Sequence, residues 1–185
     1  MNHWWQIRMA VEAVRRGEVI AYPTEAVFGL GCDPYNPNAV IDLLALKQRP
    51  VEKGLIVIGA DWQQLAPLVA PLGERDLIQI QSDWPGAVTW LLPVSDQTPP
   101  WLCGEYDTLA VRIPGHPLAR QLCRSAGTPL VSTSANPGGL PAARNGLSVR
   151  RYFGSQLGAI LNAPTGGLKR PSQIRNLKQA TIIRQ

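Results

Sequence analysis

Hydroxyl and amide side chains cluster in one short stretch, where Ser132, Thr133, Ser134 and Asn136 follow the apolar residues 130–131. Such side chains, with the free backbone N–H groups beside them, can donate hydrogen bonds to phosphate or carboxylate oxygens. Strand-to-turn transitions use the same residue types for local reasons. Taken alone, the cluster is therefore better explained as a turn.

A second cluster is cationic, because Lys47, Arg49 and Lys53 lie within seven residues, around Pro50. Proline disfavours helical geometry at the residue before it, so we expect these cations to leave a helix and enter a loop. Together with Arg112, they predict a site for a polyanion. The set contains no evident nucleophile. It suits phosphoryl or nucleotidyl transfer, which depends on positioning and on charge neutralisation.

Several other motifs of catalytic and nucleotide-binding sites are absent from the sequence. It contains neither a G-x-x-x-x-G-K-[ST] phosphate-binding loop nor a G-x-G-x-x-G nucleotide motif. Its two histidines, His3 and His116, cannot form a metal cluster with the scattered cysteines, and no serine lies in a G-x-S-x-G turn. We therefore expect no metal ligands and no Ser-His-Asp triad, and a structural role for His116.

The elements that must position these groups alternate between helices and short strands. Apolar periodicity predicts helices over residues 6–16, 36–47, 63–69, 74–82, 117–126 and 146–153. Short apolar runs predict strands over residues 19–22, 55–58, 88–93, 109–113, 130–131, 159–161 and 181–183. Residues 24–31 are expected to form a glycine-rich turn, and residues 95–101 a surface loop. The sequence predicts one α/β domain, residues 1–185, with a mixed sheet.

Charge is unevenly distributed along the 185 residues. All 13 acidic residues occur at or before Asp107, whereas 11 of the 18 Lys and Arg residues occur from Thr108 onward. A cationic C-terminal part predicts an anionic partner, such as nucleotide phosphates or nucleic acid, although scattered and solvated arginines would give the same count. These arginines must find any counter-ions in the N-terminal part.

Hydropathy and cysteine content favour a cytoplasmic protein without a membrane partner. No apolar run approaches the roughly 20 residues of a membrane helix, and the N-terminus lacks a signal-peptide pattern. The three cysteines, Cys32, Cys103 and Cys123, are widely spaced. Their odd number favours a reducing compartment over a disulfide framework.

Five segments together resemble the YrdC-like family, in the family's order and spacing. They are YPTEAVFGLG at residues 22–31, KQRPVEKGLI at 47–56, AVR at 110–112, STSAN at 132–136 and PSQIR at 171–175. The resemblance covers residues 19–184 and is greatest to the short bacterial TsaC-type members. It implies a twisted, mainly parallel or mixed sheet, wrapped by helices around a positively charged cavity.

The resemblance implies threonylcarbamoyl-AMP synthase activity, a nucleotidyl transfer. L-threonine, bicarbonate and ATP would give threonylcarbamoyl-adenylate and pyrophosphate, with Mg²⁺ bound mainly through the nucleotide. The product would feed modification of the adenosine beside the anticodon in tRNA. The implied partners therefore include the proteins that transfer the threonylcarbamoyl group, and tRNA itself.

With this resemblance, individual residues receive roles. The group expected to be catalytic is Lys47, Arg49, Lys53 and Arg112. Contacts to threonine or its carbamate are expected from Thr24, Arg112, Ser132 and Ser172. Contacts to ATP are expected from Arg49, Lys53, Thr108, Ser134, Asn136 and Arg184. Simpler roles remain open, since Arg112 can pair with a carboxylate, Lys53 can be a solvated loop charge and Thr24 can cap a turn. Glu25 receives no role, because a carboxylate would repel a bound triphosphate.

Two other functions remain open from the sequence. One is a non-catalytic module that binds tRNA or rRNA, which the charge asymmetry favours. The other is a YrdC-like paralogue with different nucleotide chemistry. An RNA binder needs aromatic platforms or a basic stripe, and the sequence has neither an RNA-recognition signature nor a KH-type glycine loop.

Overall fold

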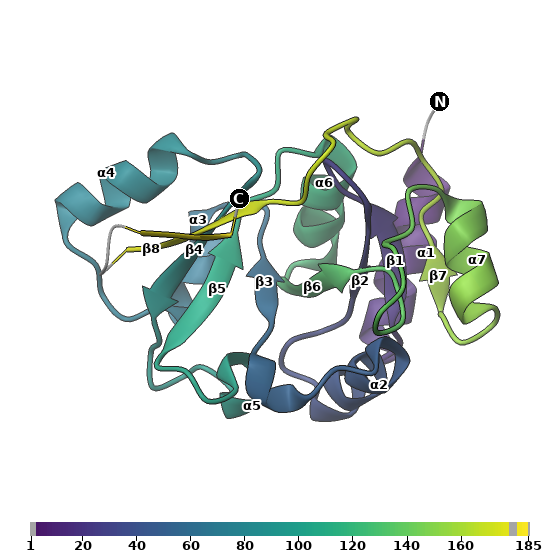
Figure 1. The fold of residues 1–185 in the computed structure, drawn as a ribbon, viewed down its shortest axis with the longest axis horizontal. Helices are drawn as coiled ribbons and strands as arrows, with labels where there is room; N and C mark the ends of the chain where they lie inside the picture. The colour runs from purple at the N-terminus through teal and green to yellow at the C-terminus, as the bar shows by residue number, and fades with distance from the viewer. Residues whose placement is uncertain (1–2, 178–180, 185) are drawn as a thin grey trace.

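The structure, a computed structural model, describes the backbone of residues 3–177 and 181–184 and the side chains of residues 3–177. Within these residues, nine strands form one open sheet in the order β7-β1-β2-β6-β3-β5-β4-β8-β9 (Figure 1). The strands are β1 (Ile20–Pro23), β2 (Phe28–Gly31), β3 (Ile56–Ile58), β4 (Val88–Pro93), β5 (Thr108–Arg112), β6 (Leu130–Ser134), β7 (Ala159–Ile160), β8 (Gln173–Asn176) and β9 (Thr181–Arg184).

The sheet mixes parallel and antiparallel neighbours, which confirms the α/β class with a mixed sheet. Strand β1 is parallel to β7, β3 to β5, and β4 to β8. The other five pairs are antiparallel, so antiparallel neighbours outnumber parallel ones in the described chain. Long parallel crossovers are correspondingly few, which agrees with the short helices of this chain.

Strand β2 is a correction to the sequence analysis, which interpreted residues 24–31 as a turn. Only the first part of this segment turns, and β2 then pairs with β1 along the register Ile20–Gly31 to Pro23–Phe28. Glycine is needed in the strand for close packing rather than for a turn. A Cβ atom at Gly31 would lie 2.5 Å from the carbonyl oxygen of Val131 and 2.8 Å from the ring of Tyr22.

Seven α-helices and two 3₁₀ turns surround the sheet in the described residues. They are α1 (Trp4–Arg15), α2 (Pro37–Lys47), η1 (Val51–Lys53), α3 (Trp62–Leu65), η2 (Ala66–Leu68), α4 (Glu74–Ser82), α5 (Pro100–Cys103), α6 (Pro117–Ala126) and α7 (Gly146–Phe153). The predicted bounds of α4, α6 and α7 are confirmed. The helix predicted over residues 63–69 is divided between α3 and η2, where Pro67 lacks the N–H that a continuing α-helix requires.

Residues at both ends of helix α2 fix where the helix begins and ends, and the capping residue at its C-terminus sets the direction of the following loop. The Asn36 side chain caps its start by accepting hydrogen bonds from the backbone N–H groups of Asn38 and Ala39, and Pro37 occupies the first position. Gln48 is the capping residue directly after the helix, and its φ of 51° is left-handed. This conformation reverses the chain direction, so that the loop after α2 runs back toward the sheet.

Two hydrophobic clusters hold these layers together. In one, α1 and α6 pack against β1 through apolar side chains such as Val14, Ile20 and Leu122. The other and larger cluster joins α2, α4 and α7 to the middle of the sheet. The three cysteines are free and buried within these clusters. In the described part of the chain, no helix combines the length and the apolar character needed to cross a membrane.

Residues 161–172 form a strap that crosses the molecule between β7 and β8, which lie toward opposite ends of the sheet (Figure 1). On the way, the backbone N–H of Gly166 donates to the carbonyl oxygen of Thr24, at 2.9 Å. The N–H of Leu168 donates to the carbonyl oxygen of Glu25, also at 2.9 Å. The strap is therefore attached to the turn between β1 and β2 before it reaches β8.

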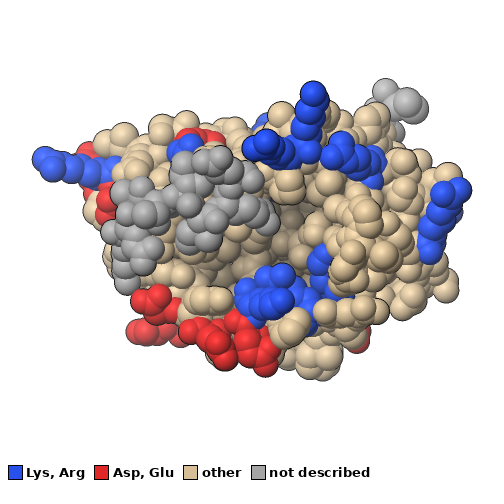
Figure 2. Space-filling view, viewed as in Figure 1, with Lys and Arg blue, Asp and Glu red and all other residues tan. Residues whose placement is uncertain are grey.

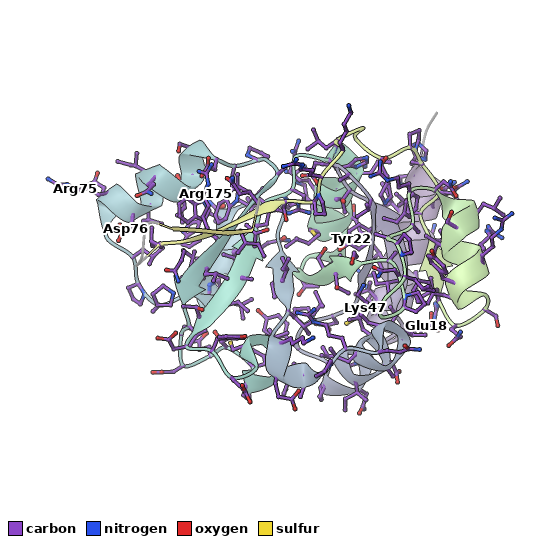
Figure 3. The ribbon with its side chains drawn as sticks, in the orientation of Figure 1. Glu18, Tyr22, Lys47, Arg75, Asp76 and Arg175 are labelled. Carbon is purple, nitrogen blue, oxygen red and sulfur yellow. The ribbon has the colours of Figure 1, made fainter. Side chains whose placement is uncertain are left out.

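The end of the strap is held by a clasp of three side chains, Asp83, Trp90 and Arg175. The Oδ2 atom of Asp83 accepts hydrogen bonds from Arg175 Nη1 at 2.8 Å and from Trp90 Nε1 at 3.1 Å. Arg175, labelled in Figure 3, also lies over the Trp90 ring, 5.7 Å from its centroid. Trp90 and Arg175 are register partners in β4 and β8, so one carboxylate joins the loop after α4 to both strands.

We predict that Asp83→Ala loosens this clasp. The free energy of unfolding should fall by about 1–3 kcal/mol, because two donors lose a charged acceptor. Amide hydrogen exchange in β8 should speed up more than exchange in β1. Urea unfolding and hydrogen exchange measure these effects. The control is Asp96→Ala, which removes an exposed carboxylate from a surface loop. Equal effects of the two substitutions would contradict the clasp.

Candidate active site

A cavity of about 440 Å³ lies on one face of the sheet. That size is within the range of pockets that bind small molecules and cofactors. Figure 2 shows a hollow in the middle of this face, with Lys and Arg side chains above and below it. The charged side chains that line the cavity are Glu25, Lys47, Arg49, Lys53 and Arg112. The hydroxyl side chains are those of Thr24, Tyr106, Thr108, Ser132, Thr133, Ser134 and Ser172.

The alternation of side chains along β5 explains why Thr108 and Arg112 share a face. Successive residues of a strand point to opposite sides, so Thr108 and Arg112 lie on the same side of β5. Leu109 and Val111, on the other side, are fully buried. The predicted strand over residues 130–131 continues to Ser134, so the hydroxyl cluster lies within β6 rather than in a turn after it.

The cavity has two chemically different ends. Lys53 precedes β3, and Arg112 ends the parallel neighbour β5, where it is the register partner of Ile58 at the far end of β3. At about 3.3 Å per residue, the first and last residues of β5 are separated by about 13 Å. The loop with Lys53 therefore lies toward the Thr108 end of β5. Glu25 and Arg112 lie at the other end.

Lys47, the last residue of α2, is almost fully bound by groups of the protein (Figure 3). Its Nζ atom donates to Ser134 Oγ at 2.9 Å, to the carbonyl oxygen of Asn136 at 2.9 Å and to Asn136 Oδ1 at 2.5 Å. Burial, reinforced by the neighbouring charge of Arg49, lowers the pKa of Lys47 to about 8. The ammonium is thus fixed in place and lies close to its titration range at neutral pH.

Arg49 holds the loop after α2 in its shape. Its Nη2 atom donates to the carbonyl oxygens of Lys53 at 3.0 Å and Gly54 at 2.8 Å, and its Nε atom donates to Gly54 at 3.3 Å. Burial lowers the pKa of the Arg49 guanidinium. Lys53, in contrast, is exposed on η1. The loop therefore offers one cation with a fixed position and one that can move to meet a ligand.

At the opposite end, Glu25 and Arg112 form a buried ion pair. Arg112 Nη1 lies 3.5 Å from Glu25 Oε2, and the two side chains are only 8% and 11% exposed. The other carboxylate oxygen, Oε1, accepts a hydrogen bond from the backbone N–H of Gly115 at 2.6 Å. Arg112 Nε and Glu25 Oε2 are buried without a hydrogen-bond partner among the described residues. The pair is thus close but incompletely satisfied.

Two further hydroxyl residues of the cavity, Thr24 and Ser172, each have a partner in the protein. Thr24 Oγ1 donates to the carbonyl oxygen of Val27 at 2.7 Å, as expected for a residue that caps a turn. Ser172 Oγ lies 3.0 Å from Thr89 Oγ1, which connects the strap to β4. Both residues line the cavity as well. Thr24 is the donor in its own hydrogen bond, so its oxygen can also accept one from a ligand.

Nine of the ten predicted site residues whose side chains the structure describes line this cavity, and Asn136 does not. Asn136 accepts from Lys47, and its Nδ2 atom donates to the carbonyl oxygens of Pro137 and Leu140. Its observed contacts therefore position Lys47 and close the turn after β6. Arg184 ends β9, and its side chain lies outside the part of the chain that the structure describes.

His116 lies outside the cavity lining and has a structural environment. It precedes α6, and its Nε2 atom lies 3.1 Å from the carbonyl oxygen of Pro164 in the strap. Burial lowers its pKa, so the neutral ring is favoured.

In the sequence analysis, Glu25 received no role and Tyr106 was overlooked, although both residues line the cavity. The signal for Glu25 was its place beside Thr24 in the first motif, whereas no sequence signal distinguished Tyr106 in its loop.

Comparison with known proteins agrees with the motifs. The family model Sua5_yciO_yrdC, described as "Telomere recombination", matches residues 12–185. A curated relative from Stutzerimonas stutzeri (strain A1501), named threonylcarbamoyl-AMP synthase, is 50% identical over 180 residues. That alignment covers 97% of each protein. A relative of the same name from Pseudomonas aeruginosa (strain UCBPP-PA14) is 51% identical over 180 residues, again with 97% of each protein covered.

A solved structure has the same fold. P. abyssi Sua5, in a crystal structure described as complexed with L-threonine, superposes with a TM-score of 0.89 and 31% sequence identity. The superposition covers 96% of this chain and 52% of the P. abyssi protein, so the chain spans about half the length of that Sua5. Family model, full-length relatives and fold agree, and the chain belongs to the Sua5/YciO/YrdC family.

Proposed function

We propose that the protein is a threonylcarbamoyl-AMP synthase, which converts L-threonine, bicarbonate and ATP into threonylcarbamoyl-adenylate and pyrophosphate. The full-length relatives of about 50% identity carry this name, and P. abyssi Sua5 was crystallised with L-threonine. The observation that carries the proposal is the composition of the cavity. One end holds a cationic loop suited to a triphosphate, and the other holds an Arg–Glu pair suited to an amino acid.

The proposed reaction has two steps. The ammonium of threonine first loses a proton to water. The neutral amine then attacks the carbon of bicarbonate with release of water, or that of CO₂ with release of a second proton, and forms a carbamate. A carbamate oxygen then attacks the α-phosphorus of ATP, the bond from that phosphorus to the bridging oxygen breaks, and pyrophosphate leaves. This is a nucleotidyl transfer. Both steps bring anions together, so the site must supply fixed positive charge and close orientation.

The charged residues fit these needs in two groups. Lys47, Arg49 and Lys53 are placed to neutralise the triphosphate, and the first two are already held in position before a ligand binds. We assign Arg112 to the carboxylate of threonine, since this residue lines the cavity and its Nε atom has no hydrogen-bond partner within the described residues. The hydroxyls of Thr24, Ser132 and Ser172 are assigned to threonine or its carbamate. Those of Thr108 and Ser134 are assigned to the nucleotide.

Magnesium is proposed to enter with ATP, held mainly by phosphate oxygens. Within the described residues, no group of three His, Cys, Asp or Glu side chains is placed to hold a metal ion. Among the described residues, Glu25 is the one carboxylate that lines the cavity, and its charge is paired with that of Arg112. These residues fit a cation that the nucleotide carries. When bound, Mg²⁺ would neutralise phosphate charge alongside Lys47 and Arg49.

The cellular role follows from the product. We propose that threonylcarbamoyl-adenylate passes to proteins that attach the threonylcarbamoyl group to the adenosine beside the anticodon of tRNA. We propose a cytoplasmic location on the same ground. Direct binding of tRNA to this chain is a separate proposal, which the cationic C-terminal part supports.

The first prediction tests the reaction itself. Purified protein with ATP, Mg²⁺ and bicarbonate should release pyrophosphate only when L-threonine is added, because the carbamate is the nucleophile. Pyrophosphate release and mass detection of the adenylate are the measurements. Turnover that ignores threonine would favour a paralogue with different nucleotide chemistry. Tight tRNA binding without any turnover would favour the RNA-binding module.

The second prediction concerns Arg112. Arg112→Ala should raise the KM for threonine by about 10- to 100-fold, because a charge-assisted hydrogen bond contributes about 1.5–3 kcal/mol. The Kd for ATP should change less than about threefold, since the triphosphate binds at the other end of the cavity. Arg124→Ala, an exposed substitution on α6, is the control and should change neither value. An equal loss of threonine and ATP binding would contradict the assignment.

The third prediction concerns pH. The pKa of Lys47 is about 8, so its ammonium form declines as pH rises through this value. The affinity for Mg-ATP should therefore fall above pH 8, by at most about tenfold per pH unit. Calorimetric titration from pH 6.5 to 9.5 measures this dependence. In Lys47→Met, affinity should be lower and its fall around pH 8 should disappear, whereas Lys53→Met should weaken binding and keep the fall. A wild-type profile retained in Lys47→Met would refute the role of Lys47.

A further inference from the structure

One oxygen of Glu25 is buried at the cavity without a hydrogen bond. Glu25 lines the cavity and is buried. Its Oε1 atom is occupied by the N–H of Gly115, whereas Oε2 has no hydrogen-bond partner among the described residues. A buried carboxylate oxygen without a donor is costly, and most native structures avoid it. This oxygen is therefore a candidate to receive a donor from a ligand.

Arg112 does not supply the missing hydrogen bond to Glu25 Oε2. Its Nη1 atom lies 3.5 Å from Glu25 Oε2, which is longer than the 2.7–3.2 Å of a good N–H···O hydrogen bond. Arg112 Nε is itself buried and unpartnered within the described residues. One unsatisfied acceptor and one unsatisfied donor, of opposite charge, thus belong to two paired residues that line the same cavity. A single ligand with a cationic donor and an anionic acceptor a few ångströms apart would satisfy both.

A free α-amino acid is such a ligand, because its ammonium and carboxylate are attached to the same carbon. We propose that Glu25 Oε2 binds the ammonium of the amino-acid substrate while Arg112 binds its carboxylate. This inference rests on the proposed function, which supplies L-threonine as the substrate. It gives Glu25, which received no role from the sequence motifs, a direct part in recognising that substrate.

The same arrangement of charges would direct the two substrates to opposite ends of the cavity. A carboxylate in the wall disfavours a triphosphate at the Glu25 end, whereas Lys47, Arg49 and Lys53 favour it at the other end. After carbamate formation, the nitrogen still carries one N–H that can donate to Oε2. The new carbamate oxygens are repelled by Glu25 and attracted by the cationic loop. Glu25 thus orients the nucleophilic oxygen toward the nucleotide.

A purely structural role for Glu25 is the competing explanation. Its Oε1 atom fixes the loop at Gly115, and its backbone carbonyl oxygen accepts from Leu168 in the strap. The backbone contact survives any side-chain substitution. A structural role would weaken the binding of every ligand at this end of the cavity alike. Recognition of an ammonium instead predicts a selective loss for ligands that carry this group.

The experiment compares two ligands that differ in that group. Calorimetric titration measures the Kd of L-threonine and of (R)-3-hydroxybutanoate, which is threonine without its amino group. Wild-type protein should prefer threonine by at least about 10- to 100-fold, the range expected for a charge-assisted hydrogen bond. In Glu25→Gln this preference should fall to about threefold or less, while the Kd of Mg-ATP stays within about threefold. Glu12→Gln, which changes an exposed carboxylate paired with Arg15 on α1, should leave the preference unchanged.

Further variants keep the test decisive if Glu25→Gln fails to fold. Removing one member of a buried ion pair is more damaging than removing both. The double variant Glu25→Gln/Arg112→Gln is therefore compared with Arg112→Gln. Arg112→Gln should bind threonine weakly but keep the preference over (R)-3-hydroxybutanoate, and the double variant should lose it.

A preference that survives in both Glu25 variants would overturn the role of Glu25 and leave the synthase proposal intact, provided that wild-type protein releases pyrophosphate with threonine. Wild-type protein that neither binds threonine nor turns over with it would overturn both proposals. A parallel loss for both ligands in the variants, with the ratio of the two Kd values unchanged, would establish the structural role alone.

Discussion

The burial of one carboxylate, that of Glu25, constrains the arrangement of the whole site. A charged group inside a protein costs several kcal/mol unless hydrogen bonds and an opposite charge compensate for it. Here the compensation comes from three parts of the chain. The loop after β5 supplies the N–H of Gly115, β5 supplies Arg112, and the strap attaches to the backbone of the same residue. Correct placement of the turn between β1 and β2 therefore requires that β5 and the strap are also in place, which couples the local motifs of the family into one cavity.

The same reasoning explains the uneven charge along the sequence. The C-terminal part has no carboxylate, so its arginines depend on the N-terminal part or on backbone carbonyls. Arg112 pairs with Glu25, and Arg175 pairs with Asp83. Arg120 instead donates to the carbonyl oxygens of Pro114 and Gly115. The two parts are thus held together by ion pairs that neither part could form alone, and part of the cationic excess serves the fold rather than a ligand.

The sequence predicted those features that depend on local chemistry. Caps and apolar periodicity predicted α2, α4, α6 and α7, and the five motifs predicted most of the residues that line the cavity. The errors arose where tertiary contacts, rather than the local sequence, determine the secondary structure. Strand β2 was missed because its glycines make room for Tyr22 rather than form a turn, and β8 was missed because it depends on pairing with β4 and on the Asp83 clasp. The contacts of Asn136 with Lys47 connect residues 89 positions apart, and no local pattern reveals such a pair.

Preorganisation links this architecture to the chemistry that we propose. Lys47 is held by Ser134 and Asn136, and Arg49 by carbonyl oxygens of its own loop, so both side chains lose their conformational freedom on folding rather than on binding. The lowered pKa of Lys47 reflects the cost of keeping an ammonium in this buried position. An incoming triphosphate would relieve that cost, because its negative charge restores the interactions that burial removed. The same would hold at the other end, where the unsatisfied atoms of Glu25 and Arg112 fit a ligand with charges of both signs. Folding thus leaves this cavity electrostatically incomplete at both ends, and in the reaction that we propose the two substrates would complete it in different places.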